Sequence, residues 1–252
     1  MSVYLTGLLW VGGAAVIAAV LAYVIRKYGE LEGRTANNEA AGQVFTLVGG
    51  LHAVLVAFVL IALFDAVTQA GDAAYREADG LVAATWASEA LSPEAGQEVR
   101  QLSREYALTV INDEWPGMRA GTDFESDGWS QLNELRQVVA RTPASDQWQV
   151  ERKTEAANQL WKVYEARQAR LDAAGSGVNT VVWFVLIAGS VLAVCLPLLF
   201  GGPRIRTHVL IVATFAATVT LLLYATYQLQ NPFGGGADVS PEAFEAAVER
   251  FG

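Results

Sequence analysis

Four long apolar runs constrain the fold of this chain more than any other feature of its sequence. They cover residues 3–25, 44–64, 178–200 and 209–229. A helix needs about 20 apolar residues to cross the roughly 30 Å hydrocarbon core of a bilayer, and each run meets that length. The chain is 17% charged, below the roughly 25% that is usual in soluble domains. The sequence therefore predicts an all-α membrane protein with four transmembrane helices.

A long polar insert divides the four predicted spans into two pairs. We expect transmembrane helices 1 and 2 within residues 1–67 and transmembrane helices 3 and 4 within 177–230. Between them, 68–176 shows helical periodicity broken by turn residues, which predicts an extramembrane helical domain. Residues 231–252 predict a C-terminal tail with a short amphipathic helix, which we expect to dock onto the insert or onto a neighbouring subunit.

Within the insert, Ser92 and Pro93 predict the capped start of a helix. Pro116 in "EWPGM" predicts the end or a kink of that helix, because proline lacks the backbone donor. We interpret the tryptophans of the insert mainly as anchors of its core; they are Trp86, Trp115, Trp129, Trp148 and Trp161.

The distribution of basic residues predicts the orientation in the membrane. Short basic loops stay in the cytoplasm, and long loops count weakly in this rule. The N-terminus has no basic residue and the tail has only Arg250, whereas the insert carries 18 acidic and 11 basic residues. We therefore expect both termini and the insert to be extracytoplasmic. The basic residues of the two short loops are Arg26, Lys27, Arg34, Arg204 and Arg206.

A polar stripe rich in aspartate, called the acidic stripe below, begins where the second apolar run ends. Asp65, Gln69 and Asp72 follow one another at helical spacing, and the pattern continues through Arg76 and Asp79. The second span is therefore predicted to continue out of the membrane as one helix, to about position 90. Asp65 has two interpretations, a solvated helix edge or an acidic residue at a pore mouth.

His52 lies inside the second apolar run, about 12 Å from its start at 1.5 Å per residue. It shares a helical face with Val56, Val59 and Leu63. Ionisable residues within a membrane usually face the interior of a helix bundle or a water-filled cavity. Two interpretations stay open for His52, structural packing and a pore or proton role.

The remaining candidate chemistry is sparse. Asp113 and Glu114 could join a cation site or belong to a solvated helix end, and no EF-hand spacing follows them. The sequence shows no catalytic motif, and its one cysteine, Cys195, lies in the third apolar run. We therefore predict no enzyme activity, no cofactor and no metal site. The acidic insert also argues against a nucleic-acid partner.

The chain resembles the bestrophin-like membrane proteins of bacteria, a family long catalogued as a domain of unknown function. The resemblance covers nearly the whole chain and rests on the order and spacing of four motifs. They are "READGL" at 76–81, "EWPGM" at 114–118, "RQARL" at 167–171 and "NPFGGGADVSPEAF" at 231–244, of which the last is the most specific. "GSGVNTVVW" at 175–183 departs from the proline-containing start expected for the third span.

The resemblance implies a function, since bestrophins are ion channels that assemble as pentamers around a pore lined by the second span. By this resemblance the chain would form a homo-oligomeric, pentameric channel for small inorganic ions in the bacterial plasma (inner) membrane. His52, Val56, Val59 and Leu63 would then be pore-lining or gating residues, together with the stripe that begins at Asp65.

Two expectations from the sequence differ from what the resemblance implies. Bestrophins keep their termini and helical domain in the cytoplasm, opposite to the orientation that the charges predict. The acidic stripe does not fit anion conduction and favours cations, because carboxylate rings attract cations. The alternative function is a non-conducting membrane anchor whose helical domain binds a partner or a ligand.

Overall fold

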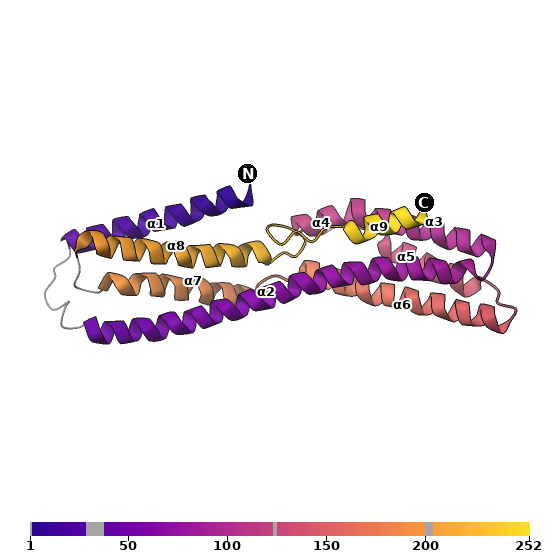
Figure 1. Cartoon of the computed structure of the whole chain (residues 1–252), viewed down its shortest axis with the longest axis horizontal. Helices are drawn as coiled ribbons and strands as arrows, with labels where there is room; N and C mark the ends of the chain where they lie inside the picture. The colour runs from indigo at the N-terminus through magenta and orange to yellow at the C-terminus, as the bar shows by residue number, and fades with distance from the viewer. Residues whose placement is uncertain (1, 29–37, 123–124, 200–203) are drawn as a thin grey trace. The chain divides into compact units, whose positions relative to one another are not determined.

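The computed structural model describes residues 2–28, 38–122, 125–199 and 204–252. Every regular element in these ranges is helical (Figure 1), which confirms the predicted all-α class. The elements are α1 (Val3–Tyr28), α2 (Asn38–Glu89), α3 (Pro93–Thr109), the π-helical η1 (Val110–Glu114), α4 (Trp115–Ala120), α5 (Gly128–Arg141), α6 (Gln147–Gly175), α7 (Thr180–Cys195), the 3₁₀-helical η2 (Leu196–Leu199), α8 (Ile205–Leu229) and α9 (Glu242–Phe251).

Four helical segments are long and apolar enough to cross a membrane, and they coincide with the four apolar runs of the sequence. They are Val3–Tyr28, Gly42–Glu89, Thr180–Leu199 and Ile205–Leu229. Arg34, one of the basic residues used to predict the orientation, lies outside the described residues.

The chain divides into two compact units. The first unit contains Met1–Phe64 and Val178–Gln230, and the second unit contains Asp65–Gly177 and Asn231–Gly252. α2 contributes to both, because it is one helix of 52 residues. Its sequence contains no proline, so no backbone donor is missing along it. The predicted continuation of the second span as a single helix is therefore confirmed.

In the first unit, α1 and α8 pack closely because small residues face bulky ones. A Cβ atom at Gly7 would lie 2.6 Å from Cε1 of Tyr224, so glycine makes room for that ring. The Tyr224 hydroxyl donates to the carbonyl oxygen of Val3 at 2.5 Å. Further along the pair, Ala18 packs in a buried cluster with Val212.

In the second unit, α3 begins as the sequence predicts. The Oγ of Ser92 accepts a hydrogen bond from the backbone N–H of Ala95 at 3.1 Å, and Pro93 occupies the first turn. The helix does not end at Pro116, however. It continues through the π-helical turn η1 into α4 and ends at Gly121, whose φ of 64° is left-handed. A π-helical turn is a local bulge in the hydrogen-bond ladder, and it lies next to the proline that cannot donate.

The C-terminal tail docks onto the rest of the second unit. The Trp115 ring meets the rings of Phe233 and Phe244 edge-on, with centroids 5.2 and 5.9 Å away. Its Nε1 donates to the carbonyl oxygen of Val239 at 3.1 Å. Phe233 and Phe244 are fully buried. Of the two docking partners expected for the tail, the insert is the one that the structure shows.

Candidate functional site

His52 on α2 is bonded to α7 of the same chain. Its Nε2 lies 3.0 Å from the Oγ of Ser190. A Cβ atom at Gly189 would lie 2.5 Å from its Nδ1, so the missing side chain at Gly189 is what admits the imidazole. Two interpretations were open for His52, structural packing and a pore or proton role. Within the single chain, His52 packs against another helix.

The neighbours of His52 on this face of α2 are turned into the chain's own first unit. Val56 and Leu63 are only 4% and 9% exposed, and Val59 is partly buried. These side chains are therefore occupied by contacts within one chain before any second copy is present.

The acidic stripe lies on the other side of α2. Asp65, Gln69 and Asp72 are exposed. Asp65 follows Val56 by nine residues, which is about two and a half turns at 3.6 residues per turn. We call His52, Val56, Val59 and Leu63 the His52 set. One face of α2 therefore cannot present both the His52 set and Asp65 to one pore. The exposed apolar residues on the side of Asp65 are Leu47, Leu51, Val54, Phe58 and Ile61.

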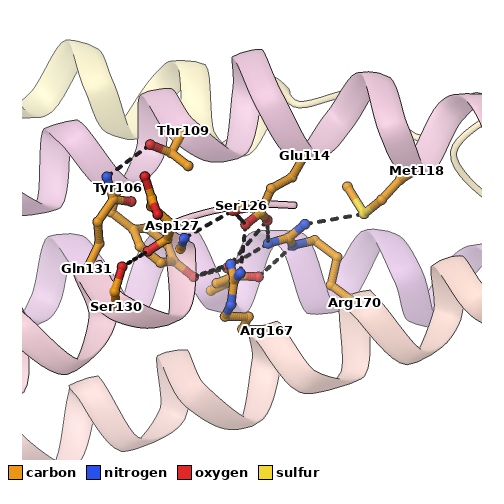
Figure 2. A network of polar contacts seen from close by, with 12 residues as sticks. Tyr106, Thr109, Glu114, Met118, Ser126, Asp127, Ser130, Gln131, Arg167 and Arg170 are labelled. Atoms are coloured by element: carbon orange, nitrogen blue, oxygen red, sulfur yellow. Dashed lines mark hydrogen bonds and ion pairs between the residues drawn. The ribbon is translucent and has the colours of Figure 1, made fainter. Parts of the chain in front are cut away.

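A second candidate site, which the sequence analysis did not predict, is a cluster of charges inside the second unit (Figure 2). Glu77 of α2, Glu114 of η1, and Arg167 and Arg170 of α6 are buried together with Tyr106 of α3. We call these five residues the buried charge cluster. Two carboxylates face two guanidinium groups, so the cluster has no net charge.

Arg170 joins the two carboxylates of the buried charge cluster. Its Nε donates to Oε2 of Glu77 at 2.7 Å, and its Nη2 donates to Oε1 of Glu77 at 3.0 Å and to Oε2 of Glu114 at 2.8 Å. Arg167 donates two hydrogen bonds to Glu114, of 2.6 and 3.1 Å. The Tyr106 hydroxyl donates to Glu77 at 2.5 Å and accepts from Arg167 at 3.0 Å.

These contacts and burial shift the pKa values of Glu114, Arg170 and Tyr106. Burial raises the pKa of Glu114, but the hydrogen bond from Arg167 and the charge of Arg170 outweigh burial and keep that pKa below its ordinary value. Burial lowers the pKa of Arg170, and the charge and hydrogen bonds of Glu77 more than reverse this. Burial also raises the pKa of Tyr106 well above its ordinary value. At neutral pH the carboxylate accepts, and the guanidinium and the phenol donate.

The sequence left two interpretations open for Asp113 and Glu114, a cation site or a solvated helix end, and the second is wrong for Glu114, which is buried. Both oxygens of Glu114 accept from guanidinium groups, and Ser126 also donates to one of them. Asp113, its neighbour in the chain, is exposed. Among the described residues, no group of three or more His, Cys, Asp or Glu side chains is placed to hold a metal ion. The cluster ties helices together and leaves no carboxylate available to a ligand.

The sequence does carry a signal for the buried charge cluster. "READGL" supplies Glu77, "EWPGM" supplies Glu114, and "RQARL" supplies both arginines. Arg167 and Arg170 are spaced by three, and they follow Leu160 and Val163 at helical spacing, so they lie on the buried face of α6. The motifs that support the family resemblance are thus the ones that place charge inside the second unit.

The prediction that the insert's tryptophans anchor its core holds for Trp115, which is buried. It is wrong for four others, whose rings are exposed: Trp86, Trp129, Trp148 and Trp161. Trp129 still has a structural role, because the guanidinium of Arg167 lies 4.6 Å from its ring centroid.

Comparison with known proteins relates this architecture to one family. The model of the bestrophin-like domain matches residues 12–244. A variant of a bacterial bestrophin homologue from Klebsiella pneumoniae is 13% identical, with a TM-score of 0.73 over 97% of each chain. Another structure of that homologue is 14% identical, with a TM-score of 0.71 over 98% of this chain and 95% of the other.

A structure described as a variant of a membrane protein has a TM-score of 0.71 at 14% identity, over 100% of this chain and 97% of that one. At such identities the likeness shows a shared fold. The comparison with curated proteins found no match.

Proposed function

Because the chain belongs to the bestrophin-like family, we propose that it is the subunit of a homo-oligomeric ion channel, a pentamer with its pore along α2. We place this channel in the plasma membrane of a bacterium. Its partners are further copies of the chain, the lipid bilayer and small inorganic ions. The proposal rests on the family's resemblance to bestrophins and on one feature of α2.

That feature is the exposed outer face of α2. Leu51 and Phe58 are 68% and 67% exposed, and they lie on the side opposite to the buried Val56. From Leu47 to Ile61 the exposed apolar residues are spaced alternately by four and three, which is the spacing of a seam between parallel helices. In a ring of subunits these side chains would form a narrow apolar passage, and hydrophobic constrictions gate ion flow by dewetting.

The acidic residues at the end of this face support a preference for cations. Asp65 and Asp72 are exposed and follow Phe58 by seven and fourteen residues, which are about two and four turns. Repeated around an axis, each would form a ring of carboxylates, and such rings attract cations. Gln69 lies between them and adds a polar, uncharged lining group.

We assign the His52 set a supporting role in the same channel. His52 holds α2 against α7, and Val56, Val59 and Leu63 are buried or partly buried on the same face, so we assign these four residues to fixing the position of α2 within its own subunit. A change in the contact between His52 and Ser190 would shift the outer face of α2. These four residues are thus gating candidates that act from behind the pore wall.

Single-channel recording in planar bilayers tests the proposal. Phe58→Ala widens the apolar passage and is expected to raise conductance, whereas Phe184→Ala is the matched control, because Phe184 is an exposed phenylalanine on α7. Asp65→Asn and Asp72→Asn are expected to lower the permeability of cations relative to anions. Equal conductance of both phenylalanine variants would count against a pore along α2.

Particle symmetry in detergent separates the two candidate functions. A ring with a central aqueous path supports the channel. A folded monomer, or a folded oligomer that stays silent in bilayers, would instead favour the non-conducting anchor with a partner-binding helical domain.

The orientation is a separate part of the proposal. The basic short loops support termini and a helical domain outside the cytoplasm. In a Cys195→Ser background, a cysteine placed by Ser145→Cys lies in the exposed loop before α6. If the helical domain lies outside the cytoplasm, a membrane-impermeant maleimide is expected to label this cysteine in intact cells. Labelling only after lysis would give this chain the cytoplasmic orientation known for bestrophins.

A further inference from the structure

A groove opens on the surface of the first unit, over α8 and between α1 and α7. Thr220, Leu223 and Tyr224 of α8 form its floor, and its walls include Trp10 of α1 and Trp183 of α7. Its volume is about 580 Å³. All three helices belong to segments long and apolar enough to cross a membrane, so this surface faces the bilayer or another helix.

The groove begins at one end of the three helices. The Tyr224 hydroxyl reaches Val3 at the start of α1, and Nε1 of Trp183, near the start of α7, donates to Oε1 of Gln230 at 3.2 Å. The starts of α1 and α7 and the end of α8 are therefore neighbours. Tryptophan and tyrosine concentrate at the level where the bilayer meets water, which places this end of the groove at that level.

An apolar hollow of this size would cost contact energy if it stayed empty, because the atoms lining it would lack neighbours on one side. Two occupants are available in a membrane, the acyl chain of a lipid and a helix of a second copy. The bulky rings of Trp10 and Tyr227 are exposed at the groove and keep another backbone at a distance. Helices in membranes associate instead through small residues. α1 offers such a surface elsewhere, at Gly12 and Gly13, where a Cβ atom would meet nothing within 4 Å.

We propose that this groove binds one acyl chain of a glycerophospholipid. The chain lies along α8 from Gln228 towards Thr220, a length of about 12 Å at 1.5 Å per residue. Thr6 and Gln228 are the polar side chains at the interfacial end, where the ester and phosphate groups of the lipid are found. None of the nine described residues lining the groove is charged, so the site selects the acyl chain and not the charge of the headgroup.

Photo-crosslinking tests this site independently of channel activity. The full-length protein is reconstituted in vesicles of phosphatidylethanolamine and phosphatidylglycerol that contain a lipid with a diazirine on its acyl chain. After illumination, labelled peptides are mapped by mass spectrometry. We expect adducts to concentrate at Leu223, Ile187 and Tyr227, and we expect zwitterionic and anionic diazirine lipids to label them equally.

A filling variant provides the control for specificity. Leu223→Trp occupies the floor of the groove and is expected to abolish the groove adducts, whereas Leu210→Trp, at an exposed position on the same helix, is expected to leave them unchanged. Labelling spread over all exposed positions of α7 and α8, or a strong dependence on headgroup charge, would overturn the proposal. Protein–protein crosslinks at Trp10 in place of lipid adducts would overturn it as well, and would identify a second copy as the occupant.

Discussion

Replacing Arg170 with methionine tests whether the buried charge cluster holds the second unit together. The substitution keeps a long apolar side chain and removes the donors that reach Glu77 and Glu114 at 2.7 to 3.0 Å. Arg167 compensates only in part, because its Nη1 is 3.8 Å from Glu77 and its donors already bind Glu114. Two carboxylates are then left buried against one guanidinium. Removing one partner of a buried ion pair costs about 3–5 kcal/mol, which lowers an unfolding midpoint by on the order of 10 °C in a domain of this size.

The assay is thermal unfolding of the full-length protein in detergent, followed by near-ultraviolet circular dichroism at one fixed scan rate. The matched control is Arg119→Met, which removes an ion pair of 2.9 Å to Asp238 whose two side chains are exposed. Such a pair contributes about 0–1 kcal/mol, so its midpoint should barely move. The double variant Glu77→Gln with Arg170→Met removes both opposite charges and should recover part of the loss. Equal midpoints for Arg170→Met and Arg119→Met would refute the reasoning.

Three further predictions follow from other contacts. The folded-state pKa of Glu114 is lowered from 4.5, so its stabilising effect is present above pH 4.5 and is lost as the pH falls through the folded value; unfolding midpoints measured across acid pH should therefore fall less steeply for Glu114→Gln than for the wild type. Gly189→Ala should lower the midpoint by forcing His52 away from α7, and His52→Ala in the same chain should restore it; no rescue would mean that the imidazole is not what Gly189 accommodates. Trp115→Ala should cost about 3–5 kcal/mol and release the tail, seen as faster proteolysis of the C-terminal segment, whereas the exposed Trp86→Ala should not.

The sequence is sufficient to predict the helical framework because its signals are local. Apolar length determines the spans, and the side chain of Ser92 with Pro93 determines where α3 begins. The continuation of α2 past Asp65 also follows from spacing within one segment. Each of these predictions concerns residues a few positions apart, whose relation is fixed by the geometry of a single helix.

The buried charge cluster could not be predicted in that way. Glu77 and Arg170 are 93 positions apart, and nothing local distinguishes a carboxylate that will be paired in a core from one on a solvated helix face. The same limit explains the error at Glu114, which looked like part of a solvated end beside Asp113. The partner of His52 on α7, Ser190, lies 138 positions along the chain, so the burial of the His52 face within one chain was not evident from the sequence.

The buried charge cluster also constrains the surface that the channel proposal uses. On α6, Arg167 and Arg170 point to one side, and on α2 only Glu77 meets them. If α2 turned about its axis, Glu77 would leave the two buried guanidinium groups with Glu114 as their remaining carboxylate, and uncompensated buried charge is costly. Asp72 precedes Glu77 by five residues, about 1.4 turns, so the ion pairs that hold Glu77 inward keep Asp72 outward. The motifs "READGL" and "RQARL" therefore orient the acidic stripe of α2, although the charges of the cluster are themselves buried.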